Sequence, residues 1–230
     1  MTDIYQSGEY VANNPTYDVE DSPWKAGLIV RMLEKHGIVP QSVCEVGCGA
    51  GEVLVALQDL LPDATRFTGF DVSPFAYERC RPHENERLDF RCGDFLSIDT
   101  ERFDLVNCLD VFEHVEDYLG FLRNLRSRAE WKLFHIPLDM WVGSVLFSFP
   151  ILNVRRSVGH LHYFSKETAL LSLEHAGYEI VDWSYTAGSI ERGRGPVNAL
   201  FNVPRRLFYP IHADLTVRLF GGYSLLVLAR

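Results

Sequence analysis

Apolar residues along the chain fall into two alternating patterns. Short apolar runs typical of buried strands are followed by stretches in which apolar residues recur every three or four positions, as on one face of a helix. Up to Pro137 these patterns predict strands over 42–46, 66–70, 88–92, 103–108 and 131–136, and helices over 24–33, 52–61, 74–80 and 115–127. The alternation predicts an α/β fold, with a doubly wound, mostly parallel sheet covered by helices on both faces.

The rhythm changes after Pro137. Residues 138–158 are apolar without a clear period, and we expect them to be irregular. A helix over 166–176, a strand over 178–186 and a final strand over 223–228 complete the expected elements.

The length of the chain predicts one domain over residues 1–230. Residues 1–41 precede the first strand and are expected to cover the site. Two long segments, 138–164 and 187–221, separate later elements and are expected to form a lid or cap. Arginines 192, 194, 205 and 206 lie among aromatic residues in the second segment, which could also offer a dimer face or a membrane-surface patch.

Charge and cysteine content narrow the classes of partner and compartment. The net charge is −9, with −12 in residues 1–150 and +3 in residues 151–230, so we expect no nucleic-acid partner. The odd number of cysteines argues against a disulfide framework and favours buried thiols. The N-terminus does not resemble a signal peptide, and the longest uncharged run is too short to span a bilayer. We therefore expect a cytoplasmic protein without an integral membrane segment.

The segment 43–51, VCEVGCGAG, ends a predicted strand in three alternate glycines. Turns of this kind bring a backbone close to a ligand. A phosphate-binding Walker loop needs a lysine after the last glycine, and none follows Gly51. A dinucleotide fingerprint needs a third glycine where Glu52 stands, and that carboxylate would face a pyrophosphate.

The pattern Glu45-x-Gly47-x-Gly49-x-Gly51 instead resembles motif I of the class I S-adenosylmethionine-dependent methyltransferases. Three further segments match that family in order: Phe70-Asp71-Val72, Gly93-Asp94-Phe95, and 109–115 with Asp110 and His114. The resemblance covers about residues 24–186 and 222–230. It implies a seven-stranded sheet of order 3-2-1-4-5-7-6 with strand 7 antiparallel, and S-adenosylmethionine as cofactor.

The resemblance also implies roles for individual residues. Glu45 would meet the cofactor's ammonium group, Asp71 the ribose diol and Asp94 the adenine amino group, with Phe95 packed on the ring. Lys25 would pair with its carboxylate, and Tyr10 or Trp24 would wall the site. The full set of expected cofactor-binding residues is Tyr10, Trp24, Lys25, Glu45, Gly47, Cys48, Gly49, Gly51, Phe70, Asp71, Val72, Gly93, Asp94, Phe95, Leu109, Asp110, Val111 and His114.

Candidate catalytic residues are His114, His160 and His162. The element Asp110-x-x-Glu113-His114 resembles the ExxEH element of metal-using small-RNA 2′-O-methyltransferases and quinone O-methyltransferases, with Asp110 in place of the first glutamate. His160 or His162 could supply a further metal ligand. We favour a pocket-lining or capping role for His114 and expect no metal.

These features predict a methyltransferase that transfers a methyl group to oxygen, nitrogen or carbon of a small-molecule acceptor, mainly by proximity and orientation. Aromatic residues in the expected lid favour an apolar or aromatic acceptor. Two alternatives stay open: a non-catalytic module that keeps the fold for binding, and a nicotinamide-dependent oxidoreductase.

Overall fold

The computed structural model describes residues 8–97, 101–191 and 196–230. Its strands are β1 (Ser42–Val46), β2 (Arg66–Asp71), β3 (Leu88–Cys92), β4 (Phe103–Leu109), β5 (Ala129–Pro137), β6 (Ile180–Thr186) and β7 (Ser224–Ala229). Its α-helices are α2 (Glu9–Asn13), α3 (Ser22–Lys35), α4 (Glu52–Leu60), α5 (Pro74–Cys80), α6 (Tyr118–Leu125), α7 (Val142–Phe147), α8 (Phe149–Ser157), α9 (Lys166–His175), α10 (Gly188–Glu191), α11 (Pro196–Phe208) and α12 (Ala213–Phe220). Its short 3₁₀ turns are η1 (Val19–Asp21), η2 (Arg81–His83), η3 (Phe112–His114) and η4 (Arg126–Arg128).

The strands form one seven-stranded sheet in the order β3-β2-β1-β4-β5-β7-β6. Neighbours from β3 to β5 pair in parallel, whereas β7 runs antiparallel between β5 and β6. The order and the reversed strand confirm the fold expected from the sequence.

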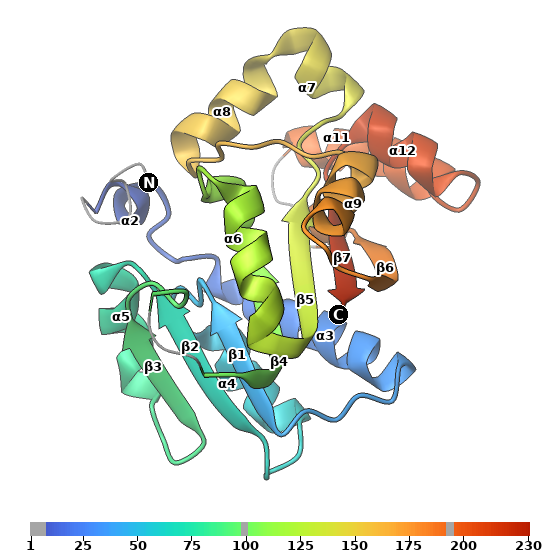
Figure 1. Ribbon diagram of the computed structural model, residues 1–230. Helices are drawn as coiled ribbons and strands as arrows, with labels where there is room; N and C mark the ends of the chain where they lie inside the picture. The colour runs from blue at the N-terminus through green and yellow to red at the C-terminus, as the bar shows by residue number, and fades with distance from the viewer. Residues whose placement is uncertain (1–7, 98–100, 192–195) are drawn as a thin grey trace.

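Helices cover both faces of this sheet, with α6 and α9 in front and α3 and α4 behind in Figure 1. Side chains of β4 point alternately to the two faces of the sheet and so contribute to the core on both faces. Val106 and Cys108 pack in the cluster that contains Leu122 of α6, and Leu105 packs with Ile29 of α3 on the other face. Burial on both faces is typical of parallel strands and explains their near-continuous apolar sequences.

Two expected elements are wrong. Residues 138–158 are not irregular but contain α7 and α8, and Pro150 stands in the first turn of α8, where a missing N–H costs no hydrogen bond. The helix expected over 115–127 begins later, because the Asp117 side chain caps it by accepting from the Gly120 N–H at 2.9 Å. Buried thiols are also the wrong expectation for Cys92, which is exposed at the end of β3.

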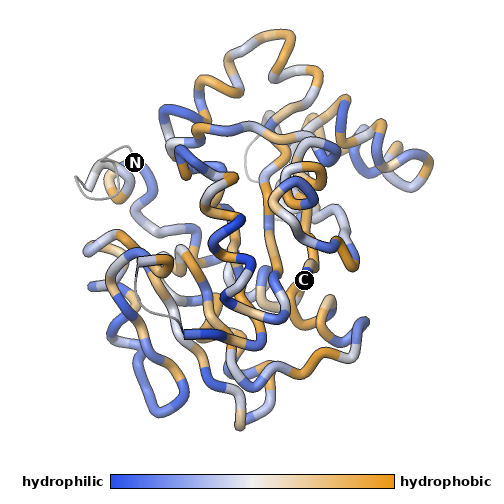
Figure 2. The backbone as a smooth tube through the Cα atoms, in the orientation of Figure 1, coloured by the Kyte–Doolittle hydropathy of each residue, from blue (hydrophilic) through white to orange (hydrophobic). Residues whose placement is uncertain are grey.

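The helices α7, α8, α11 and α12 lie together at one end of the molecule, where Figure 2 shows several apolar stretches. Trp141, just before α7, packs against Phe201 of α11 with 6.0 Å between ring centroids. On α11, Leu200, Val203 and Leu207 follow helical spacing and are all exposed. Phe147 of α7 and Phe149 of α8 are likewise 71% and 70% exposed, which explains why the apolar pattern in the sequence did not identify these two helices. Within the described ranges, no helix has the length and apolar character needed to cross a membrane.

Candidate active site

The glycine turn follows β1 at the carboxyl edge of the sheet. The loops after β2, β3 and β4 begin at the same edge. Gly47 and Gly51 have φ angles of 75° and 81°, which favour glycine. A Cβ atom at Gly47 would lie 2.6 Å from Cγ2 of Val111, and one at Gly51 would lie 2.5 Å from Cζ of Phe90. Packing within the fold therefore requires both glycines, in addition to any approach to a ligand.

The Asp71 carboxylate at the end of β2 joins two loops. Oδ2 accepts from the backbone N–H of Gly49 and Oδ1 from that of Ser73, both at 2.8 Å. Burial raises the pKa of Asp71 above its ordinary value, while the two backbone donors act in the opposite direction. Because each carboxylate oxygen has a second lone pair, Asp71 can hold the glycine turn and still accept hydrogen bonds from a ligand.

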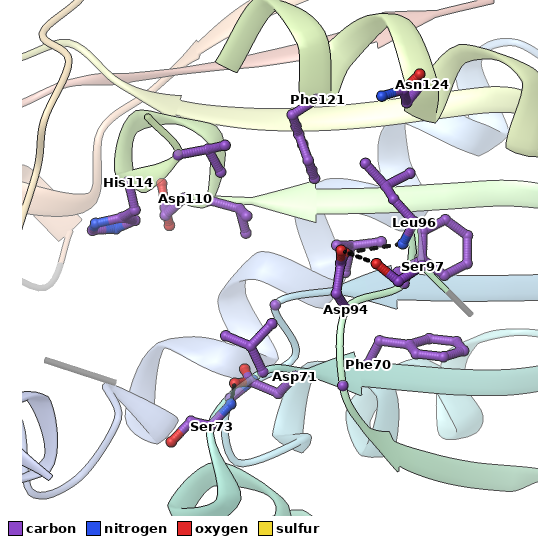
Figure 3. A pocket seen from close by; sticks show the side chains of 18 of the residues that line it. Phe70, Asp71, Ser73, Asp94, Leu96, Ser97, Asp110, His114, Phe121 and Asn124 are labelled. Carbon is purple, nitrogen blue, oxygen red and sulfur yellow. Dashed lines mark hydrogen bonds between the residues drawn. The ribbon is translucent and has the colours of Figure 1, made fainter. Parts of the chain in front are cut away.

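Asp94, after β3, faces the same space (Figure 3). Its carboxylate accepts from the Leu96 N–H at 3.0 Å and from the Ser97 hydroxyl at 2.6 Å, so it also closes a local turn. The next residue, Phe95, is buried and packs edge-on against Phe70 with 5.0 Å between ring centroids.

These loop residues line a cavity of about 500 Å³. Expected residues among its lining are Tyr10, Gly47, Gly49, Phe70, Asp71, Val72, Gly93, Asp94, Phe95, Asp110, Val111 and His114. Figure 3 shows Phe121 and Asn124 of α6 across the cavity from Asp94. We call this space the strand-end cavity.

A second cavity of about 390 Å³ adjoins it and shares Tyr10, Gly47, Gly49, Asp110 and His114 with it. Expected residues that line only this one are Lys25, Glu45, Cys48, Gly51 and Leu109, and His160 joins them. We call it the glycine-turn cavity.

Glu45 is a buried carboxyl group of the glycine-turn cavity whose pKa is strongly raised. It is 2% exposed, and its Oε2 atom has no hydrogen-bond partner among the described residues. Burial raises the pKa of Glu45 to about 8, although nearby Lys25 lowers it. A cation placed beside Oε2 would therefore meet a carboxyl group without a competing donor.

Lys25 donates to Asp110 Oδ2 at 2.8 Å, and His135 Nδ1 lies 2.7 Å from Asp110 Oδ1. Burial alone would raise the pKa of Asp110, but His135 and Lys25 lower it below its ordinary range. The other His135 nitrogen lies 2.9 Å from Oγ1 of Thr186, so the network reaches from α3 to β6. Lys25 thus pairs with a protein carboxylate rather than standing free for a ligand.

The three candidate histidines lie in two different places. His114 and His160 lie with ring centroids 4.8 Å apart, and His160 Nδ1 lies 2.6 Å from Asp139 Oδ2. Burial and His160 lower the pKa of His114 to about 4. His162 instead points to the backbone oxygen of Val115 at 2.9 Å and lines neither cavity in the described part of the chain.

Glu113, His114 and His160 offer ligand atoms within 4.8 Å of one another. Both Glu113 oxygens are buried and have no hydrogen-bond partner in the described residues, and burial raises the pKa of Glu113 well above its usual range. One carboxylate and two imidazoles could hold a divalent cation. Asp110, the other acid of the motif, is held by Lys25 and His135 and lies outside this group.

Trp24 lies apart from the two cavities. It lines a third cavity, of about 730 Å³, where its indole N–H donates to Glu191. Arg192 and Arg194 fall outside the described residues.

The sequence interpretation missed several residues of these cavities: Tyr17, His135, Asp139, Glu191 and Tyr223. It also missed Thr186, which lines none of them but contacts His135. A signal was present for His135, because a histidine in an otherwise apolar strand needs polar partners. The others come from connecting segments, strand ends or, for Glu191, the end of α10, where sequence spacing does not indicate spatial proximity.

Comparison with known proteins matches residues 23–182 to a family model described as a methyltransferase domain. The ubiquinone biosynthesis O-methyltransferase of Histophilus somni is 27% identical over 104 residues, which are 41% of this chain and 42% of that protein. The matched part thus spans about two fifths of that relative's length.

Solved structures share the fold at low sequence identity. One chain of the complex between the Haloferax volcanii Trm112 methyltransferase activator and a putative methyltransferase is 16% identical, with a TM-score of 0.66 over 97% of this chain and 94% of that one. Magnesium protoporphyrin IX methyltransferase from Synechocystis, with bound SAH, is 17% identical, with a TM-score of 0.60 over 90% and 82% of the two chains. With the sheet order and a family match over more than half of its length, the chain belongs to the methyltransferase-domain family and has the class I S-adenosylmethionine-dependent methyltransferase fold.

Proposed function

We propose that this chain is an S-adenosylmethionine-dependent methyltransferase acting on a small-molecule acceptor. The observation that carries the proposal is the charge of the strand-end and glycine-turn cavities. In the described part of the chain, Lys25 is the one lysine or arginine that lines either, and Asp110 already pairs with it. Glu45, Asp71 and Asp94 therefore face a ligand without cationic side chains for a pyrophosphate, which suits a sulfonium cofactor better than a dinucleotide.

The cofactor roles follow from the positions of the acids. Glu45, with its unpartnered Oε2, would hold the ammonium group, and Asp71 would accept from the ribose hydroxyls. Asp94 would accept from the adenine amino group, beside the buried Phe95. Support for this assignment comes from the Synechocystis enzyme, whose structure contains SAH.

S-adenosylmethionine, when bound, supplies a methyl group attached to a positively charged sulfur. When the methyl group is transferred, this sulfur becomes a neutral thioether. The protein then has to orient the acceptor and exclude water. The pKa of His114, lowered to about 4, keeps this imidazole neutral near pH 7, so it can accept a hydrogen bond that orients an acceptor O–H or N–H. Asp139 holds His160 beside it.

We also propose that the described parts of 1–41 form a cover segment, and those of 138–164 and 187–221 a lid or cap, over the acceptor side; residues 1–7 and 192–195 lie outside the described residues. The exposed stripe of Leu200, Val203 and Leu207 on α11 would pack against a second copy of the chain. Light scattering on protein eluted from a size-exclusion column should then show a dimer for the wild type and a monomer for Leu207→Glu. A monomer in both would refute this face as the interface.

Calorimetry with S-adenosylmethionine, S-adenosylhomocysteine and NAD tests the cofactor assignment. We expect the first two to bind and NAD not to bind, and binding of NAD alone would favour the oxidoreductase. A second assay follows S-adenosylhomocysteine formation across a panel of oxygen, nitrogen and carbon acceptors. Cofactor binding without transfer to any of them would favour a non-catalytic module.

A further inference from the structure

The helices α7 and α8 form a corner at the top of the molecule in Figure 1, where Figure 2 shows apolar stretches. The chain turns between the two helices at Ser148, which has a φ angle of 55°. Large apolar side chains on both sides of this turn are between 46% and 71% exposed: Val142, Val145, Leu146, Phe147, Phe149 and Leu152. We call this surface the α7–α8 corner. Apolar residues exposed singly are common, but a continuous group of them marks a surface that contacts a protein or a membrane.

The charge of the α7–α8 corner differs from that of the rest of the chain. No aspartate or glutamate occurs between Asp139 and Glu167, whereas Arg155 and Arg156 lie in the last turn of α8. Both arginines are exposed, and neither side chain has an ion pair or a hydrogen bond with another described residue. The corner is therefore locally basic in a chain whose net charge is −9.

The position of Arg156 on α8 connects this charge to the apolar surface. Arg156 follows Phe149 and Leu152 at helical spacing, so the three lie on one side of the helix. An arginine in this position can lay its apolar stem along the surface and extend its guanidinium group beyond it. The outer side of α8 thus combines exposed apolar side chains with a cation that has no partner within the described chain.

The other side of α8 faces the site. Val154, Ser157 and Val158, on the opposite side of the helix from Phe149 and Leu152, line the glycine-turn cavity. A partner on the outer side of α8 would therefore lie one helix away from that cavity.

The charge of the corner decides between two occupants. A symmetric contact between two copies would place the same corner on both sides, so Arg155 and Arg156 of one copy would face the same pair of the other. Like charges without an acid between them repel one another. Anionic lipid headgroups would instead supply the missing negative charge, and the boundary between headgroups and acyl chains would accept the apolar side chains.

We propose that the α7–α8 corner docks on the surface of a lipid bilayer that contains anionic headgroups. Leu146, Phe147 and Phe149 enter the boundary between headgroups and acyl chains, and Arg155 and Arg156 contact lipid phosphates. The docked protein holds the glycine-turn cavity close to the bilayer surface. Docking of this kind does not depend on which reaction the protein catalyses.

Cosedimentation of the full chain with vesicles tests the proposal. One kind of vesicle contains phosphatidylcholine alone, and the other also contains about 30% phosphatidylglycerol, which is anionic. We expect the protein to bind the anionic vesicles about tenfold more tightly at about 0.1 M salt. Most of this preference should disappear at about 0.5 M salt, because salt screens the attraction between the arginines and the phosphates.

Matched variants separate the corner from the rest of the surface. Leu146→Ser removes a side chain that is 69% exposed, and it should weaken vesicle binding about fivefold. Leu171→Ser on α9, where the leucine is 61% exposed, is its control and should change nothing. Arg156→Gln should weaken binding to the anionic vesicles about fivefold, whereas its control Arg123→Gln, at an exposed arginine of α6, should not.

Equal binding to the two kinds of vesicle, or binding to neither, would overturn the proposal. Equal effects of Leu146→Ser and Leu171→Ser on vesicle binding would also overturn it, and thermal unfolding shows that each variant compared is folded. Light scattering on the same samples distinguishes the other occupant. If Leu146→Ser lowers the molecular mass in solution but leaves vesicle binding as in the wild type, the corner is an interface between protein chains and the proposal is wrong.

Discussion

Replacement of Asp71 by alanine tests the cofactor site most directly. The carboxylate holds the backbone N–H groups of Gly49 and Ser73, both at 2.8 Å, and is assigned to the ribose hydroxyls. Loss of it leaves two donors at the cavity wall without their acceptor and removes the acceptor for the ligand. Unsatisfied partners of this kind cost about 1–3 kcal/mol, so the affinity for S-adenosylhomocysteine should fall roughly 5- to 150-fold.

Two further variants separate the ligand contact from general damage. Asp71→Asn should also weaken binding, because its amide nitrogen would face a backbone donor. Asp89→Ala removes an exposed carboxylate of β3 that pairs with Arg91 at 2.8 Å, and it should leave the affinity unchanged.

Isothermal titration calorimetry measures the dissociation constants, and thermal unfolding shows whether each variant is folded. The Asp71→Ala protein should melt at a lower temperature than the wild type, because the glycine turn loses one of its anchors. A folded Asp71→Ala protein that binds S-adenosylhomocysteine within about twofold of the wild type would refute the ribose assignment.

Three other properties follow from the buried groups. The pKa of Glu45, raised from 4.5 to about 8, means that the folded protein holds an extra proton between these values, so stability should fall as pH rises through this window. Urea unfolding at pH 5 and pH 8 should show a smaller fall for Glu45→Gln, and equal falls would contradict the assignment. Because the pKa of His114 is lowered to about 4, its NMR signals should stay constant from pH 5.5 to 8, and a titration near 6.5 would contradict its burial. Removal of metal ions with a chelator should leave the melting temperature of the protein and its affinity for S-adenosylhomocysteine unchanged. Stabilisation by added Mn²⁺ or Zn²⁺ that Glu113→Gln abolishes would instead show a metal site.

The parts of the fold that could be predicted from sequence are those whose burial follows a regular period. The parallel strands are buried on both faces, so their apolar runs mark them directly, as in β4 with Leu105, Val106 and Cys108. The helices α7, α8 and α11 have apolar side chains turned to solvent, so their apolar residues gave no sign of which side is buried. Phe147 and Leu200, for example, are 71% and 72% exposed.

The candidate site divides in the same way. Asp71 is the last residue of β2 and Asp94 lies two residues after β3, and both strands end at one edge of the sheet, so their proximity follows from topology. Glu113 and His160 meet only because the chain returns after α8, and the N–H groups of Leu161 and His162 donate to the Glu113 backbone oxygen at 2.8 and 3.0 Å. Such a long-range contact has no signal in local spacing. The partners of Lys25 and Trp24, which are Asp110 and Glu191, are distant in sequence for the same reason.

The uneven charge of the chain acquires a structural meaning from the cavities. Residues 1–150 carry a balance of −12, and acids from this part line all three cavities. Lys25 and His135 lower the pKa of Asp110, whereas burial raises the pKa of Glu45 to about 8, so Glu45 holds a proton near pH 7 in the empty protein. A positive charge beside its unpartnered Oε2 would favour the ionised form of Glu45. A positively charged methyl donor would supply that charge, so its binding should raise the melting temperature more at low salt than at high salt.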